Sequence, residues 1–296
     1  MRINEQSLQG LIDRAADLNT RQTSIAKQIS SGLRLTALSD DPAAAGQAVV
    51  LSNSLRYADS FLATAATATS RLQAADTALG AVVTQLTSAV ATTIGAVSGT
   101  SNPDARAAAA QQLTSIRTSL LALANSGYNG AYLFSGTSTA PPFQQDSSGN
   151  VAYSGNAATG ALSIGSGVDV KTATDGASIF LNAGSSVFGA LNAVIANLTA
   201  AGTTASTDST TLVANLRSAL TNVSGQREML NATAASITAA TTYTASQKTN
   251  LQAEQSSLLS ADITLLATEL SAATKQRSAL LSSIAIVEKG SLFDYL

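Results

Sequence analysis

The two ends of this chain carry apolar side chains at matching helical spacing, and this pattern constrains the fold more than any other feature. The N-terminal stripe comprises Leu8, Leu11, Ala15, Leu18, Ile25 and Ile29. The C-terminal stripe comprises Leu259, Ile263, Leu266, Leu270, Ala273, Leu280, Ile284 and Val287. Steps of three and four residues, about 3.5 on average, are typical of a coiled-coil seam. The sequence therefore predicts two terminal helices whose seams face each other.

A single helix of this length is only marginally stable in water, so each terminal helix needs a partner. A buried Leu or Ile contributes about 1.5–3 kcal/mol, and two helices alone bury little area. We therefore expect the pair to be loose in the monomer and to tighten against other copies. The predicted assembly interface consists of Leu8, Leu11, Leu18, Ile25, Ile29, Ile263, Leu266, Leu270, Leu280, Ile284 and Val287.

One polar residue interrupts each seam, namely Gln22 in the first and Arg277 in the second. A polar seam residue can set the register of a coiled coil. Simple exposure to solvent explains the two positions equally well, and the sequence leaves both interpretations open.

The composition excludes several classes of partner. Charged residues make up 11% of the chain, with 16 basic and 18 acidic side chains, whereas an ordinary soluble domain has about 25% charged residues. This balance gives no electrostatic reason to expect binding to nucleic acid or to an acidic membrane surface. The chain has no run of 18 apolar residues, and its opening lacks an apolar core before a cleavage site. We therefore expect no membrane span and no cleaved secretory signal.

The residue inventory also excludes most catalytic chemistry. The chain has no His, no Cys and no Trp, so zinc sites built on His or Cys and thiol or imidazole catalysis are unavailable. Its carboxylates do not converge on any loop that resembles a pocket. The sequence therefore predicts a protein that is not an enzyme and that binds no cofactor and no metal.

The end of the first helix is followed by a strong helix-start signal. Asp40 or Asp41 can cap a helix by accepting hydrogen bonds from free backbone N–H groups, and Pro42 is tolerated in the first turn. Metal binding by the two aspartates lacks a third ligand nearby, so we interpret Asp40, Asp41 and Pro42 as a helix cap. The helix is expected to run to about Val97.

The next elements follow from similar signals. Asn102 and Pro103 predict the start of another helix, which 125–127 (Asn-Ser-Gly) ends. Asn129-Gly130 then predicts a hairpin turn beside an aromatic segment. From there to about residue 185 short apolar segments alternate with Gly, Ser, Pro and Asn, which indicates a small β-rich insertion. Helices resume at about Ser186 and, after a break, at about residue 208.

Together these elements predict a mainly α fold, a long antiparallel helical bundle formed by both chain ends. It has a terminal coiled-coil pair, a second helical layer and a small β-rich insertion at the tip. The expected domains are 1–38 with 259–296 as the terminal coiled coil, 39–137 with 186–258 as a helical rod, and 138–185 as the β-rich insertion.

Several segments resemble the flagellin superfamily, and most of all its hook-associated protein 3 group, the FlgL-type proteins of the hook-filament junction. These segments are the opening 1–3 (MRI), 39–49 (SDDPAAAGQAV), 125–136 (NSGYNGAYLFSG), 260–262 (SAD) and 291–294 (SLFD). The resemblance covers residues 1 to about 137 and 186–296, and the middle is not diagnostic.

The resemblance implies a secreted structural subunit of the bacterial flagellum, exported by the flagellar type III apparatus and located between hook and filament. It implies copies of the chain in a ring, neighbouring hook-associated protein and flagellin subunits, and an export chaperone as partners. Two alternatives stay open: a flagellin that forms the filament itself, and a secreted coiled-coil effector or adhesin.

Overall fold

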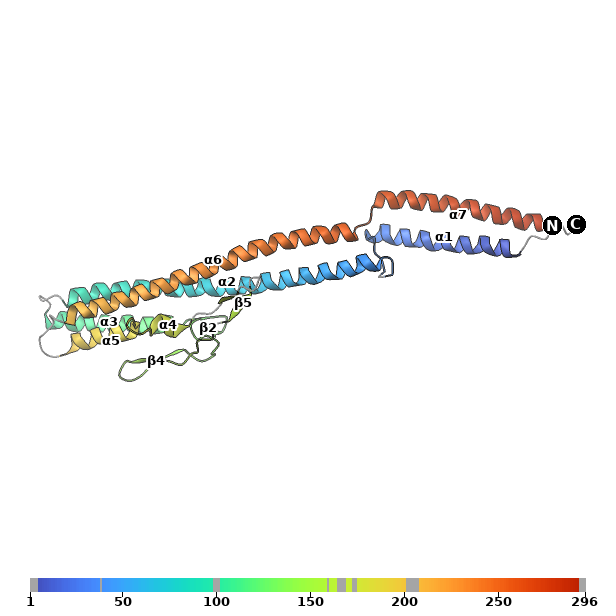
Figure 1. Cartoon of the computed structure of the whole chain (residues 1–296). Helices are drawn as coiled ribbons and strands as arrows, with labels where there is room; N and C mark the ends of the chain where they lie inside the picture. The colour runs from blue at the N-terminus through green and yellow to red at the C-terminus, as the bar shows by residue number, and fades with distance from the viewer. Residues whose placement is uncertain are drawn as a thin grey trace. The chain divides into compact units, whose positions relative to one another are not determined.

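The computed structural model describes residues 5–37, 39–97, 102–158, 160–163, 169–171, 175–200 and 208–292. Within these ranges the structure is mainly helical (Figure 1). The helices are α1 (Glu5–Ser31), α2 (Pro42–Ala96), α3 (Pro103–Ala124), α4 (Gly176–Phe180), α5 (Val187–Thr199), α6 (Asp208–Leu259) and α7 (Ile263–Leu292). Packing divides the chain into two compact units, residues 1–59 with 246–296, and residues 60–245.

The helix boundaries follow the capping signals in the sequence. The side chain of Asn102 accepts a hydrogen bond from the backbone N–H of Ala105 at 2.7 Å, and Pro103 is the first residue of α3. In the same way Ser186 accepts from the N–H of Gly189 at 3.1 Å at the start of α5. Both side chains satisfy backbone donors that an uncapped helix leaves without partners. The predicted starts of these two helices are confirmed.

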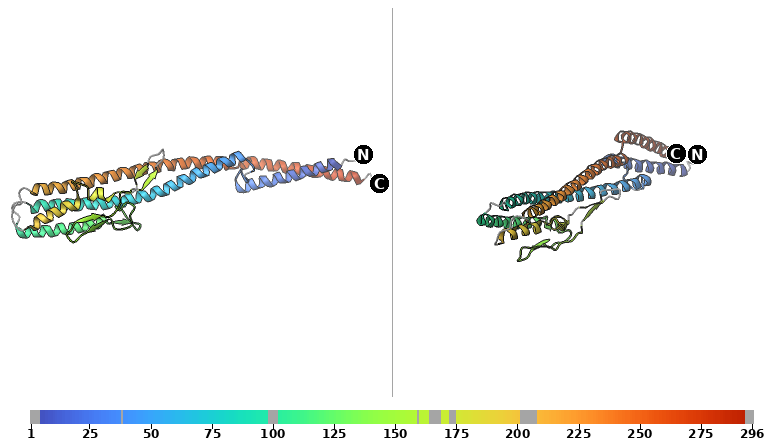
Figure 2. Two further views of the ribbon diagram at one scale, coloured as in Figure 1. Left: turned by 60° about the horizontal axis from the view of Figure 1, so that its bottom comes forward. Right: turned by 60° about the vertical axis from the view of Figure 1, so that its left-hand side comes forward.

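In the unit of residues 60–245 the helices α2, α3, α5 and α6 lie alongside one another (Figure 2), and a continuous hydrophobic core joins them to α4 and to the β-rich insertion. Its fully buried large side chains are Leu79, Leu86, Leu113, Leu120, Phe134, Phe143, Ile179, Phe180, Phe188, Leu191, Leu216 and Ile237. Many of the remaining core positions are alanine, which lets the helices pack closely. By length and composition alone α2 could cross a membrane; its most apolar window has a mean hydropathy of 1.3, and 33% of that window is buried in the structure. The core helix of a soluble protein can have the same length and composition.

The predicted β-rich insertion consists of short antiparallel hairpins. The pairs are β1 (Gly127–Tyr128) with β2 (Ala131–Tyr132), β3 (Phe143–Gln145) with β4 (Val151–Tyr153), and β5 (Ala161–Ser163) with β6 (Asp169–Lys171). Asn129 and Gly130 connect β1 to β2 with φ of 50° and 78°. A two-residue hairpin turn needs positive φ at both positions, which Asn and Gly adopt most easily. The turn expected at these residues is confirmed.

The insertion lies against α3 and α5. Arg117 of α3 donates to Asn192 Oδ1 of α5 at 2.7 Å, and Asn192 Nδ2 donates to the carbonyl of Gly149 in the β3–β4 turn at 2.9 Å. The sequence did not predict α4, which lies inside the segment expected to be β-rich. Phe180 of α4 packs edge-on against Phe134 and Phe143, at centroid distances of 5.5 and 5.2 Å. This cluster attaches the insertion to the core.

The mainly α fold class, with its helical pair of chain ends and small β-rich insertion, is confirmed. The two compact units divide the chain within α2 and α6, because each of these helices contributes residues to both units. The three-part domain division, 1–38 with 259–296, 39–137 with 186–258, and 138–185, therefore stays a prediction.

Candidate assembly site

The two terminal helices lie side by side and run in opposite directions, as both views show (Figures 1 and 2). Their facing residues are those of the predicted seams. Ile25 of α1 and Ala273 of α7 are each 4% exposed. Leu11, Leu18 and Ile29 on α1, and Leu266, Leu270, Leu280 and Ile284 on α7, are half-buried.

One predicted interface residue with a described side chain, Ile263, does not join this seam. Ile263 lies in the first turn of α7 and is 53% exposed, so the seam begins at Leu266. The side chains of Leu8 and Val287 lie outside the described residues. Ile25 and Ala273 are the only fully buried side chains among those described in α1 and α7. The pair therefore buries much less per helix than an ordinary bundle.

The two polar seam residues, Gln22 and Arg277, meet each other. Arg277 donates to Gln22 Oε1 at 3.3 Å, and Gln22 Nε2 donates to Thr274 Oγ1 at 3.4 Å. Beside this layer Arg21 forms an ion pair with Glu269 at 3.4 Å. The side chain of Arg21 is 64% exposed and that of Glu269 is 39% exposed, so this ion pair contributes little to stability.

The chain passes between α1 and α2, and again between α6 and α7, through adjoining loops. The backbone N–H of Arg34 donates to the carbonyl of Leu259 at 2.7 Å, and that of Ala261 donates to the carbonyl of Gly32 at 3.0 Å. These two bonds form an antiparallel bridge between Leu33 and Ser260. They hold together two segments that are more than 200 residues apart in the sequence.

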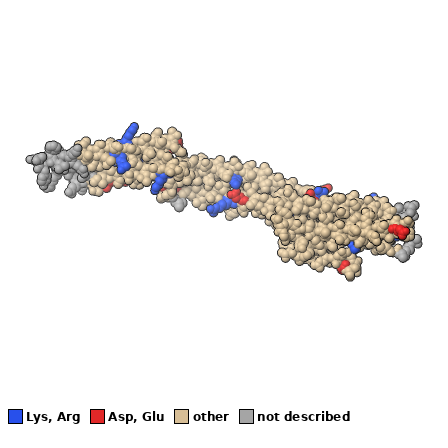
Figure 3. Space-filling view, turned by 180° about the vertical axis from the view of Figure 1, so that it is seen from behind, with Lys and Arg blue, Asp and Glu red and all other residues tan. Residues whose placement is uncertain are grey.

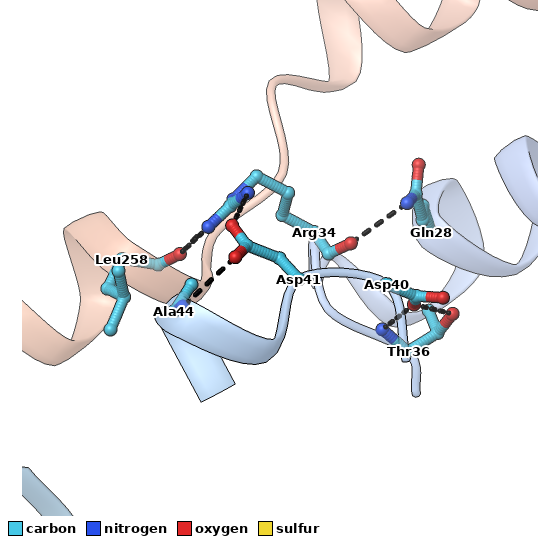
Figure 4. Close-up of polar contacts among 7 residues, drawn as sticks. All are labelled: Gln28, Arg34, Thr36, Asp40, Asp41, Ala44 and Leu258. Carbon is cyan, nitrogen blue, oxygen red and sulfur yellow. Dashed lines mark hydrogen bonds and ion pairs between the residues drawn. The ribbon is translucent and has the colours of Figure 1, made fainter. Parts of the chain in front are cut away.

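Arg34 strengthens this corner with its side chain (Figure 4). Its guanidinium donates to the carbonyl of Leu258 at 3.3 and 3.4 Å and to Asp41 Oδ2 at 3.2 Å. The carbonyl of Arg34 in turn accepts from Gln28 Nε2 at 2.8 Å. Arg34 thus links the last turn of α6, where carbonyls lack helical partners, to the first turn of α2. No local pattern indicates this link, because the two helix ends are far apart in the chain.

The two aspartates before α2 have different partners. Asp41 Oδ1 accepts from the N–H of Ala44 at 3.0 Å, which places Asp41 as the N-cap before Pro42. The N–H of Ala44 and the Arg34 side chain both lower the pKa of Asp41. Asp40 instead accepts from the backbone N–H groups of Ala37 and Thr36, which hold its pKa below the usual value. Asp40 therefore closes the preceding loop and does not cap the helix.

The surface of the terminal pair combines apolar and charged side chains. An open groove of about 600 Å³ is lined by Leu11, Leu18 and Leu280 together with charged residues, namely Arg14, Asp17 and Arg21. On the face of the whole chain in Figure 3, the charged side chains are few and scattered. Among the described residues no group of three acidic side chains is arranged to hold a metal ion. The side chains of this site are suited to packing helices against one another.

These features define a class of protein in which the first and last helices pair with each other and a mainly helical core carries a small β-rich insertion. Residues 3–139 match the family model of the bacterial flagellin N-terminal helical region. The predicted resemblance to the flagellin superfamily is confirmed.

Among curated proteins the chain is similar to flagellar hook-associated protein 3. It is 36% identical to that protein from Salmonella typhimurium over 147 residues, which are 49% of this chain and 45% of the relative. It is 37% identical to the protein of the same name from Escherichia coli over 118 residues, which are 39% of this chain and 37% of the relative. The chain thus spans less than half the length of these curated relatives.

Solved structures share the fold. A flagellar hook-associated protein from Vibrio parahaemolyticus superposes with a TM-score of 0.67 at 20% identity, covering 75% of this chain and all of that one. Hook-associated protein 3 from Legionella pneumophila superposes with a TM-score of 0.65 at 15% identity, covering 71% of this chain and 98% of that one. At such low identity the likeness shows the fold alone.

Proposed function

We propose that this chain is a structural subunit of the bacterial flagellum that forms the junction between hook and filament. The observation that most supports this proposal is the incomplete burial of the paired α1 and α7 helices. Apolar side chains that remain exposed on them are Ile12 (46%), Ile263 (53%), Leu265 (56%), Leu281 (49%) and Ile286 (71%). Burying such side chains against neighbouring subunits would contribute about 1.5–3 kcal/mol each.

The sequence relatives favour the junction over the filament, because both are hook-associated protein 3. On this proposal the partners are copies of the chain in a ring, adjacent hook-associated protein and flagellin subunits, the type III export apparatus and an export chaperone. The protein would be secreted, would bind neither nucleic acid nor membrane, and would catalyse no reaction. A filament flagellin stays the alternative from the same superfamily.

Localisation of a tagged copy in the natural host tests the proposal directly. We expect one focus where hook and filament meet, and a trace amount of the chain in sheared flagella. Labelling along the whole filament, with the chain as its main component, would support the filament alternative. A deletion strain that swims normally and retains its filaments would contradict both flagellar roles and favour the secreted effector or adhesin.

The assembly site is tested by placing a charge in the seam. Leu266→Asp and Ile284→Asp should abolish motility and incorporation, because a carboxylate enters a half-buried apolar seam. Ser271→Asp is the matched control, since Ser271 is an exposed residue of the same helix. Circular dichroism should show that residues 60–245 stay folded in all three variants. Normal motility of both seam variants would refute the interface but not the junction location, which the tagged copy reports separately.

A further inference from the structure

The corner where the two turns adjoin is held by polar contacts, unlike the mainly apolar seam that begins beyond it. Its backbone bonds join Arg34 to Leu259 and Ala261 to Gly32. The backbone N–H of Gly32 also donates to the carbonyl of Gln28 at 2.9 Å, and Gly32 has a φ of 68°. A glycine in this left-handed conformation ends a helix and redirects the chain, here toward the α6–α7 loop. The corner therefore holds the end of α1 beside the beginning of α7.

The guanidinium of Arg34 contacts two kinds of acceptor at once. It reaches the Leu258 carbonyl at the end of α6 with two of its nitrogen atoms, and Asp41, the N-cap of α2, with the third. A cation is favourable at a helix C-terminus and an anion at an N-terminus, so these contacts match the dipoles of both helices. A planar guanidinium presents its N–H groups in a fork, whereas a lysine ammonium acts as a single point charge.

Charge alone does not explain what Arg34 contributes. The side chains of Arg34 and Asp41 are 45% and 36% exposed, and an ion pair as exposed as this one adds little to stability. The contacts to the Leu258 carbonyl are directional, because they depend on where the N–H groups point. The shape of the guanidinium is therefore the property that joins the two turns.

We propose that Arg34 is the positioning residue of the assembly site, because its guanidinium keeps the α1–α2 turn closed on the α6–α7 turn. With the corner open, α1 and α7 would each move on a separate loop, and their pairing would have to order both helices at once. A closed corner fixes where the seam begins and still allows the seam to be loose in the monomer. The link to assembly rests on the proposed function, whereas the closure of the corner does not.

A pair of cysteines measures the closure directly, because the chain has no cysteine of its own. Leu33 and Ser260 face each other between the two backbone bonds of the bridge. In such a pair the Cα atoms lie about 4.5 Å apart, which is within the range of a disulfide. In the full-length monomer with Leu33→Cys and Ser260→Cys, equilibrium with a glutathione buffer gives the effective concentration of the two thiols.

Arg34→Ala and Arg34→Lys should each lower this effective concentration about tenfold, because the directional hydrogen bonds are lost in both. Arg56→Ala is the matched control, since Arg56 is an exposed arginine of α2, and it should leave the value unchanged. Equal effective concentrations in all variants would overturn the proposal. So would a normal value in Arg34→Lys, because charge alone would then suffice.

Incorporation into flagella gives the second measurement. Purified Arg34→Ala, added to cells of the deletion strain, should fail to incorporate, whereas Arg56→Ala should incorporate normally. Arg34→Ala that also carries the cysteine pair at 33 and 260 should incorporate when oxidised and fail again in dithiothreitol. Normal incorporation of Arg34→Ala, or no rescue by the disulfide, would overturn the role of the corner in assembly. A tagged natural chain that is absent from flagella would refute the proposed function and leave the thiol result standing.

Discussion

Residues 60–245 and the paired chain ends are built from similar long helices but differ in burial. All of the largest fully buried side chains that the structure describes lie in residues 60–245, including Phe134, Phe180 and Leu216. None of the described side chains of α1 and α7 belongs to that class, and among them only Ile25 and Ala273, each 4% exposed, are buried. The helical pattern is present in both regions, but only one region encloses its apolar stripes on several sides.

This difference shows that helical periodicity predicts which face of a helix makes contacts, but not how completely that face is buried. A helix in residues 60–245 packs against several partners within the same chain, so its stability is internal. In the α1–α7 pair each helix packs against the other, and apolar residues of both stay exposed. Its stability should therefore depend on what other molecules cover it.

The sharpest test of this comparison removes one large side chain from each region. Phe180→Ala should lower the free energy of unfolding of the main transition by about 3–5 kcal/mol, because it opens a cavity in a close-packed aromatic cluster. Ile25→Ala, in the terminal pair, should leave the midpoint of that transition unchanged. Urea denaturation followed by circular dichroism measures both.

The control for this pair is Ile12→Ala, a residue that is 46% exposed on the same helix as Ile25. It should change neither the main transition nor the pairing of α1 with α7 in the monomer. If Ile25→Ala lowered the main transition as much as Phe180→Ala, the two regions would unfold as one unit and the comparison would fail.

Amide hydrogen exchange sharpens the comparison without a mutation. In the monomer, amides of residues 5–31 and 263–292 should exchange about a hundredfold or more faster than those of the buried helical segments in 60–245. Local opening costs little where few apolar contacts must be broken. In isolated flagella the terminal amides should become protected. If the terminal amides of the monomer were as protected as those of residues 60–245, the α1–α7 pair would already be stable without other molecules.

A smaller effect is expected from the ion pair that joins α2 and α6 inside residues 60–245. Arg227 donates to both carboxylate oxygens of Asp76, at 2.6 and 3.1 Å. The Arg227 hydrogen bond lowers the pKa of Asp76, and Asp76 raises that of Arg227. Asp76→Asn should cost about 1 kcal/mol or less near neutral pH, because both side chains are partly exposed. Thermal unfolding of the variant measures the loss.

The sign of its pH dependence follows from the same contact. The folded-state pKa of Asp76 lies below its usual value of 3.8, so the stability that it contributes is present above that pH. This contribution is lost as the pH falls through the lowered pKa. Asp76→Asn should remove this part of the acid dependence. If the stability of the variant fell with pH as that of the natural chain does, other carboxylates, such as that of Asp146 in the β3–β4 turn, would account for the acid dependence.

The sequence predicted elements whose signals are local. Asn102, Ser186 and the turn at Asn129-Gly130 each act on backbone groups within three residues, so their type and position could be inferred directly. The seam could also be inferred, because helical spacing alone determines which side chains share a face. Gln22 and Arg277 were identified as its interruptions, but their contact depended on the alignment of the two helices.

The rest depended on contacts between distant segments. The bonds from Arg34 to Leu258 and Leu259 join residues more than 200 positions apart, and no local pattern encodes them. The α4 helix has five residues, too few for a helical period to be visible, and it depends on the aromatic cluster for stability. Its N-cap, Asp175 followed by Gly176, was the one signal that could have indicated it.

The last predicted effect concerns Tyr153, whose hydroxyl contacts the carbonyls of Phe134 and Asn156 at 3.1 and 3.2 Å. Burial, together with the negative charge of Asp175, raises the pKa of Tyr153 from 10.0 to about 12. Below pH 10 the phenol is protonated in both folded and unfolded chains, so stability should not change. Between pH 10 and about 12 the unfolded chain releases this proton first, so residues 60–245 should lose stability.

Unfolding midpoints measured from pH 8 to 12 test this prediction. Tyr153→Phe should be somewhat less stable at pH 8, because the hydroxyl contacts are lost, and should show a weaker decline toward pH 12 than the natural chain. Tyr243→Phe is the control, since Tyr243 is 66% exposed, and its alkaline profile should follow that of the natural chain. If Tyr153→Phe lost as much stability at alkaline pH as the natural chain, the ionisation of Tyr153 would not be the cause of that loss. The contrast between the enclosed core of residues 60–245 and the open terminal pair would then depend on packing alone.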